Sequence, residues 1–268
     1  MTQSQRAANG LDANGFIVNP CQVEKIAPAY RKLLDALLNQ LQTQLGDNLH
    51  SVYLYGSVAR GEARQYHSDL DLSLIFHHPL TDSELHMLED IQHNTLQCFD
   101  FVTKIDFDPG VLPQVLLAEE EYRWHFWLKH CCCCIYGEED LSLRFAWQKP
   151  SLAIAYALNG DLSDFLQQRL GMLNHDNAAR VGREVAKKIL RTVYTIVAVE
   201  HGSWYVSLDD IITAIRTCSL PCAPEIEAIV GLWQTEQPTQ ERVAQVIKCD
   251  ALPIVEWVAD VFAPFRSL

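Results

Sequence analysis

The sequence lacks an excess of basic residues: 21 lysines and arginines stand against 34 aspartates and glutamates, for a formal net charge of −13. A protein that binds nucleic acid along its phosphate backbone needs a basic footprint, and this chain has none overall. Nucleic-acid polymerases are therefore disfavoured, and nucleic acid is not an expected partner. The acidic balance suits a cationic small molecule better.

Long apolar runs are also missing. No stretch approaches the roughly 18 apolar residues that a membrane-spanning helix needs, and the N-terminal residues MTQSQRAANGLDANG contain no apolar signal core. The cysteines are therefore expected to be reduced thiols in a cytoplasmic protein without a membrane partner. The consecutive cysteines Cys131 to Cys134 would point to both faces of a strand, so they cannot all converge on one zinc ion.

Apolar residues, by contrast, are plentiful. Hydrophobic residues make up 49% and charged residues 21% of the 268 positions, which is enough to build real cores. After a flexible arm at residues 1–20, helical and strand-like patterns alternate up to residue 142, and only helical patterns follow. The sequence therefore predicts an α/β (α+β) fold: a domain of short strands and helices at residues 21–142, then a helical-bundle domain at residues 143–268.

Local signals predict where individual elements begin and end. Pro109-Gly110 is expected to end a third strand, Asp176 to cap a long helix that stops at Gly202, and Ser207 to open a capping box. The elements predicted in the first domain are helices over 23–45, from 81 onward and over 111–130, and strands over 50–55, 69–76, 101–107 and 131–137.

The segment YGSVARGEARQYHSDLDLSLIF, residues 55–76, joins two predicted strands through a glycine-rich turn. Strand alternation places Asp69 and Asp71 on one face, roughly 6.6 Å apart. Two such carboxylates repel each other unless a divalent cation lies between them, and Mg²⁺ prefers carboxylate and phosphate oxygens. Gly56 lets a phosphate approach the backbone, and Ser57 offers it a hydroxyl and an amide N–H. The segment therefore predicts a site for a magnesium nucleotide.

Two-metal phosphoryl chemistry usually needs a third carboxylate from a neighbouring element. The segment KIDF places Asp106 inside an apolar run, where an isolated acid is costly unless it faces a metal or a reacting hydroxyl. Asp100 and Asp108 share its parity, so alternation cannot separate them. Asp100 lies nearer the preceding helix and Asp108 adjoins Pro109, which makes Asp106 the first candidate and Asp100 the second.

The segment GSVARGEARQYHSDLDLSL resembles the nucleotidyltransferase signature of the DNA polymerase β-like superfamily, and KIDF resembles the strand that carries its third acid. The resemblance covers about residues 25–140. It implies a short mixed sheet flanked by helices that binds a nucleoside triphosphate with two Mg²⁺ ions. An acceptor hydroxyl would attack the α-phosphorus in line, and pyrophosphate would leave. The resemblance implies these roles: Asp69, Asp71 and Asp106 hold the metals, Asp106 alternatively takes the acceptor proton, and Gly56, Ser57 and Arg60 contact the phosphates.

The helical part is similar to that of the aminoglycoside adenylyltransferases that modify streptomycin and spectinomycin. The similar segments are AKKILRTVYTIVAVEHG and SLDDIITAI, and CCCCIYGEEDL resembles the strand and turn that close the first domain of that family. This resemblance implies ATP as donor and a small-molecule hydroxyl, such as that of an aminoglycoside, as acceptor. It also implies that Arg191 faces the nucleotide phosphates and that Glu184 lies near the acceptor; the alternative for both is an ordinary solvated helix face. Trp204, just after Gly202, is a candidate for lining an acceptor pocket where the cleft between the domains is expected.

Two other functions fit the same motif. A nucleotidyltransferase can instead modify a protein, as AMPylating and toxin–antitoxin systems do, and would then label a polypeptide. A non-catalytic relative would bind the nucleotide as a sensor, without turnover. The Gly-Ser turn and the three acids favour catalysis over sensing.

Overall fold

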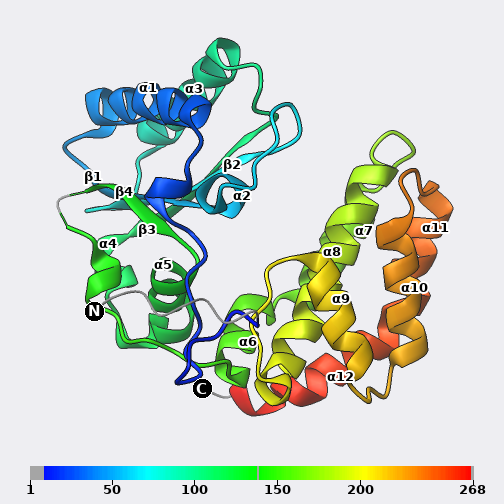
Figure 1. Cartoon of the computed structure of the whole chain (residues 1–268). Coiled ribbons are helices and arrows are strands. Elements are labelled where there is room, and N and C mark those ends of the chain that lie inside the picture. The colour runs from blue at the N-terminus through cyan, green and yellow to red at the C-terminus, as the bar shows by residue number, and fades with distance from the viewer. Residues whose placement is uncertain (1–8, 138, 267–268) are drawn as a thin grey trace. The chain divides into compact units, whose positions relative to one another are not determined.

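The computed structural model describes residues 9–137 and 139–266 (Figure 1). The described residues divide into two compact units: one lies within Asn19–Gln148, and residues 9–18 join residues 149–266 to form the other. The first unit contains a sheet with flanking helices and the second is helical, which confirms the predicted fold class. None of the helices within these residues is both long and apolar enough to cross a membrane.

The sheet of the first unit has four strands in the order β3-β2-β1-β4. Strand β1 (Leu49–Tyr55) pairs antiparallel with β2 (Leu70–Phe76) and with β4 (Cys133–Gly137). Strand β3 (Ile105–Val111) pairs with β2 in parallel. The sheet is therefore mixed, and β3 lies at its edge.

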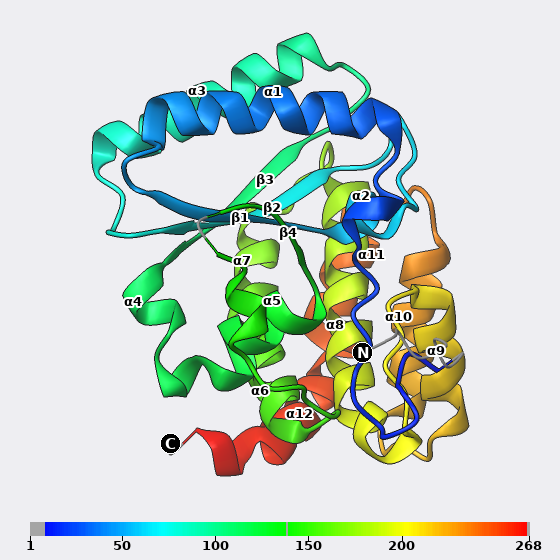
Figure 2. The ribbon, with the colours of Figure 1, turned by 60° about the vertical axis from the view of Figure 1, so that its left-hand side comes forward.

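Helices α1 (Pro28–Leu45) and α3 (Asp82–Cys98) cover one face of this sheet, and α4 (Leu112–Val115) and α5 (Phe126–His130) lie on the other side (Figure 2). The apolar positions of α1 recur at helical spacing, so one stripe faces the sheet. Their side chains share a buried core with both central strands; its members include Leu33, Leu37, Leu41, Val52, Leu54, Leu72 and Leu74.

Strand β3 differs from the prediction. It begins at Ile105 and continues through Pro109 to Val111, whereas a strand over 101–107 ended by Pro109-Gly110 was expected. Proline lacks the N–H that a central strand would donate, but an edge strand pairs on one side only. The edge position of β3 thus removes the reason to end the strand at Pro109, and it places Asp108 inside the strand.

The single helix predicted over 111–130 is also wrong. Leu117 adopts an extended backbone, with ψ of 143°, and this interrupts the helix. The segment instead forms α4, a 3₁₀ turn η2 (Ala118–Glu120), a π-helical turn η3 (Glu121–His125) and α5.

The second unit is built around the long helix α8 (Ala178–His201), against which α6 (Leu152–Asn159), α7 (Leu162–Met172), α9 (Leu208–Thr217) and α10 (Ala223–Gln234) pack. Its N-cap is Asn177 rather than the expected Asp176, and Gly202 ends it in the left-handed conformation, as predicted. Ser207 precedes α9 but makes no capping hydrogen bond through its side chain. Two further helices, α11 (Gln240–Gln245) and α12 (Leu252–Phe262), belong to the same unit.

Short helical turns lie between the larger elements of both units. They are η1 (Val23–Lys25), α2 (Gly56–Arg60), η4 (Leu141–Leu143), η5 (Val246–Asp250) and η6 (Ala263–Phe265).

The segment 9–18 packs on the helical unit, so the unit boundaries differ from the predicted 20/21 and 142/143. Leu11 and Ile17 pair across a β-bridge and are buried. The backbone N–H of Trp204 donates to the carbonyl of Asn9, and the Asn9 side chain donates to the carbonyl of Gly202. The part of the predicted arm at residues 1–8 lies outside the described residues.

Candidate active site

Three neighbouring strands align site residues in a row across one face of the sheet. Tyr55 of β1 is paired with Asp71 of β2, and Asp71 is paired with Asp106 of β3. Paired residues on neighbouring strands point to the same face, so these three side chains lie together. Burial raises the pKa of Tyr55 above its usual range, and the nearby carboxylates of Asp71, Asp108 and Asp106 raise it further.

A second row lies two residues further along the strands, where Ser73 is paired with Tyr53 and with Asp108. The Ser73 hydroxyl lies 3.3 Å from Oδ2 of Asp108, and the indole N–H of Trp127 donates to it over 3.1 Å. Asp108 is solvent-exposed as a residue. The carboxyl group itself is partly desolvated by the surrounding protein, which raises the pKa of Asp108, while the hydrogen bond from Ser73 opposes this rise.

The Gly-Ser turn directly follows β1. Gly56 has φ of +76°, and a Cβ built there would lie 2.1 Å from Oδ2 of Asp71. The turn forms the short helix α2, which ends at Gly61 in the left-handed conformation. Glycine adopts the positive φ without a steric cost, and because it has no Cβ it leaves room for the Asp71 carboxylate.

Ser57 and Arg60 lie on α2, the short helix that Gly56 begins. Ser57 is half-buried and its carbonyl accepts a hydrogen bond from the N–H of Glu62. Arg60 forms an ion pair with Glu62 over 2.8 Å. A phosphate would therefore compete with Glu62 for the Arg60 guanidinium.

Asp69 precedes β2 and is exposed. Its Oδ1 accepts a hydrogen bond of 2.5 Å from the Thr103 hydroxyl, just before β3. The side chain is therefore tied to the same edge of the sheet as Asp106.

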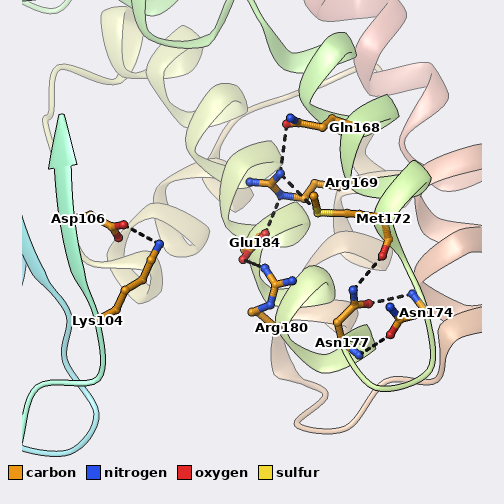
Figure 3. A network of polar contacts seen from close by, with 9 residues as sticks. All are labelled: Lys104, Asp106, Gln168, Arg169, Met172, Asn174, Asn177, Arg180 and Glu184. Carbon is orange, nitrogen blue, oxygen red and sulfur yellow. Dashed lines mark hydrogen bonds and ion pairs between the residues drawn. The ribbon is translucent and has the colours of Figure 1, made fainter. Parts of the chain in front are cut away.

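The structure separates the candidates for the third acid. Asp106 is paired with Asp71, whereas Asp100 lies in the turn after α3, outside β3. Asp106 forms an ion pair of 2.6 Å with Lys104 of the preceding segment (Figure 3). Of the three candidates, Asp106 is therefore the one that is paired directly with Asp71 across the two strands.

The donor atoms at this edge fit Mg²⁺ in their chemistry, because they are carboxylate oxygens. Within residues 9–137 and 139–266, no group of three or more histidine, cysteine, aspartate or glutamate side chains could hold a metal ion by itself. Magnesium usually binds through one or two carboxylates plus substrate phosphates. Asp71 and Asp106 meet that pattern, with the Gly56-Ser57 turn beside them.

The three predicted site residues of the second unit are arranged as follows. Arg191 is exposed on α8. Glu184, also on α8, forms ion pairs with Arg169 of α7 over 2.6 Å and with Arg180 over 2.7 Å (Figure 3). Two arginines thus already balance the charge of Glu184, and the pair with Arg169 ties α7 to α8. Trp204 is buried, with 9% of its surface exposed.

Tyr55, Ser73 and Trp127 reach the site without having been predicted as site residues. Tyr55 and Ser73 share the face of Asp71 by strand parity, so alternation could have found them. Trp127 is on α5, and its ring meets that of Tyr55 edge to face at 4.9 Å. The aromatic run from Tyr122 to Trp127 could have drawn attention to Trp127, but its contacts with Tyr55 and Ser73 form only when α5 packs on the sheet.

Comparisons with known proteins found a matching domain family and a similar fold. The family of nucleotidyltransferase domains matches residues 34–124, which include the Gly-Ser turn and all three predicted acids. The structure of spectinomycin adenyltransferase AAD(9) from Enterococcus faecialis, solved with ATP and spectinomycin, is similar in fold, with a TM-score of 0.52 at 16% sequence identity. That likeness covers 84% of this chain and 99% of the enterococcal chain. No curated protein sequence matches the chain.

The chain contains a nucleotidyltransferase domain, and its fold is similar to that of a spectinomycin adenyltransferase.

Proposed function

We propose that this protein is a magnesium-dependent nucleotidyltransferase that moves AMP from ATP to a hydroxyl group of a small molecule and releases pyrophosphate. An aminoglycoside is the candidate acceptor. The observation that carries the proposal is the pairing of Asp71 with Asp106 next to a glycine whose Cβ would collide with Asp71. A structural turn would not need two acids in register, whereas a site for a metal-bound triphosphate does.

Each predicted site residue of the nucleotidyltransferase domain has a role in this proposal. Asp69, Asp71 and Asp106 would hold two Mg²⁺ ions, which polarise the α-phosphate and balance charge on the leaving pyrophosphate. Asp106 would alternatively take the proton of the acceptor hydroxyl as it attacks. Gly56 and Ser57 would bind the departing phosphates through backbone N–H groups and the hydroxyl, and Arg60 would exchange Glu62 for a phosphate.

The three residues predicted in the helical unit also have roles in the proposal. Arg191 is proposed to bind phosphate oxygens, and Trp204 to line the acceptor site. Glu184 is proposed near the acceptor, although its ion pairs with Arg169 and Arg180 would have to be retained or exchanged. The AAD(9) structure, solved with ATP and spectinomycin, supports a nucleotide and a small-molecule acceptor as the two substrates.

A mass-shift assay tests the proposal. The protein is incubated with Mg²⁺, ATP and single acceptors, including spectinomycin, streptomycin and other aminoglycosides, and each mixture is examined for an added adenylyl group. The double variant Asp69→Asn, Asp71→Asn is expected to abolish the product. Asp100→Asn, which removes a similar charge outside the strand, is expected to leave the reaction unchanged.

The assay also separates the competing functions. A mass increase on the protein itself, with every small molecule unmodified, would favour protein AMPylation. ATP binding without any product would favour a sensor. Failure to bind ATP with Mg²⁺ would contradict nucleotidyl transfer altogether.

A further inference from the structure

The second row of the sheet carries a carboxylate that the transfer reaction does not require. Asp108 lies two residues beyond Asp106 on β3 and points to the same face, beside Ser73 of β2. In the proposed function, nucleotidyl transfer uses the three acids Asp69, Asp71 and Asp106. The fourth acid therefore needs another explanation.

Hydrogen bonding holds the Asp108 carboxylate in a defined direction. Ser73 is fully buried, with 0% of its surface exposed, and has a single hydroxyl hydrogen. Because the indole of Trp127 donates to the Ser73 oxygen, that hydrogen is directed to Oδ2 of Asp108. Trp127 is in turn supported by the ring of Tyr55. A buried chain of donors thus ends on an exposed acid, which an incidental surface carboxylate would not need.

The charge of Asp108 is not balanced by an ion pair. Asp106 has Lys104 at 2.6 Å, but no lysine, arginine or histidine among the described residues comes within ion-pair distance of Asp108. Arg123 acts on it only from a distance, and its own ion-pair partner is Glu120. Asp108 is therefore an oriented, solvent-facing anion at the site.

We propose that Asp108 is a specificity-determining residue that binds a cationic group, an ammonium or a guanidinium, of the acceptor. The inference rests on the proposed function and narrows its substrate class. Residues two apart on a strand are roughly 6.6 Å apart. With the reactive hydroxyl at Asp106 and the positive charge at Asp108, the acceptor must carry these two groups roughly 6.6 Å from each other. The acceptor is thus a small molecule.

Titration calorimetry with two cationic probes tests this inference. Spectinomycin carries ammonium groups and streptomycin carries guanidinium groups; myo-inositol is the uncharged, hydroxyl-rich probe. Titrations are run with EDTA and without nucleotide, so that neither metal nor turnover contributes. The variants are Asp108→Asn, which keeps the shape, Ser73→Ala, which removes the orienting hydroxyl, and Asp100→Asn, which controls for net charge.

Asp108→Asn is expected to weaken at least one cationic probe roughly tenfold, the effect of losing a charged hydrogen-bond partner. Ser73→Ala is expected to have a smaller effect in the same direction, and Asp100→Asn and the inositol titrations are expected to show none. The affinity of the unaltered protein for that probe should also fall as salt is added. Circular dichroism checks that each variant is folded.

Equal affinity of Asp108→Asn and the unaltered protein for both cationic probes would overturn the inference, as would the absence of saturable binding of either probe. A separate titration with ATP and Mg²⁺ reports on the proposed function, and Asp108→Asn is expected to leave it unchanged. Loss of ATP binding in the unaltered protein would instead count against nucleotidyl transfer, so the two failures are distinguishable.

Discussion

Gly56 and Asp71 are in direct contact: a Cβ on Gly56 would lie 2.1 Å from the carboxylate oxygen Oδ2 of Asp71. The turn and the strand that the sequence separates by fifteen positions are therefore one structural unit. Any side chain at position 56 must either displace this carboxylate or move the turn.

Gly56→Ala is accordingly expected to lower the rate of pyrophosphate release about 100-fold, because displacement of a catalytic group by about 1 Å has effects of that size. The positive φ adds roughly 1–2 kcal/mol of strain. Pyrophosphate release and urea denaturation measure the two effects. Gly171→Ala is the matched control, since a Cβ there meets nothing within 4 Å; equal activity in both variants would contradict the role given to Gly56.

The ion pair between Lys104 and Asp106 predicts a second outcome. Its side chains are 63% and 38% exposed, and pairs of this kind contribute about 0–1 kcal/mol to stability. Lys104→Met is therefore expected to leave the free energy of unfolding nearly unchanged. It should lower the Mg²⁺ concentration needed for half-maximal pyrophosphate release, because Mg²⁺ no longer competes with an ammonium for Asp106. A higher requirement for Mg²⁺ would show that Lys104 assists binding at the site.

A third prediction concerns the segment 9–18. Gly10 has φ of +77°, and a Cβ there would lie 2.0 Å from the carbonyl oxygen of Trp204. Gly15 has φ of +80°, but a Cβ there would meet only the Lys149 side chain, at 3.9 Å. Both alanine variants suffer the roughly 1–2 kcal/mol backbone strain, and Gly10→Ala must also break the contact with Trp204. Thermal denaturation should therefore show a clearly larger loss for Gly10→Ala; equal losses would mean that the segment does not stabilise the helical unit.

The capping box of α3 predicts a pH dependence. Hydrogen bonds from the backbone N–H and hydroxyl of Thr81, and from the side chain of Asn48, lower the pKa of Glu84. A carboxyl whose pKa is lower in the folded state stabilises the fold above its unfolded pKa, and this stabilisation is lost as the pH falls through the folded pKa.

Glu84→Gln is thus expected to destabilise the protein at about pH 7, where Glu84 is ionised, and to have a smaller effect below about pH 4, where the native carboxyl is also becoming neutral. Urea denaturation of both proteins at the two pH values measures the difference. Thr81→Ala should cost about 1 kcal/mol at neutral pH, the usual value of an N-cap. A cost of Glu84→Gln that does not change with pH would show that the charge of Glu84 is unimportant.

The sequence by itself determined the local part of this protein. Alternation in a strand places Asp71 on a known face, and glycine at position 56 signals a positive φ, because both properties depend on a few adjacent residues. The helix that ends at Gly202 and the cap at Thr81 were predictable for the same reason. The Gly-Ser turn, the Asp-x-Asp strand and the KIDF segment carried the nucleotidyltransferase resemblance.

Only the tertiary structure decided which residues meet. Asp100, Asp106 and Asp108 have the same parity, so the sequence left open which of them lies beside Asp71; the parallel register of β2 and β3 pairs Asp106 with it. Pro109 continues the strand because β3 is at the edge of the sheet, which no local pattern states. The segment 9–18 joins the helical unit through hydrogen bonds between Asn9 and residues more than 190 positions away. Such contacts form only when distant segments pack together, and for that reason the sequence pattern does not contain them.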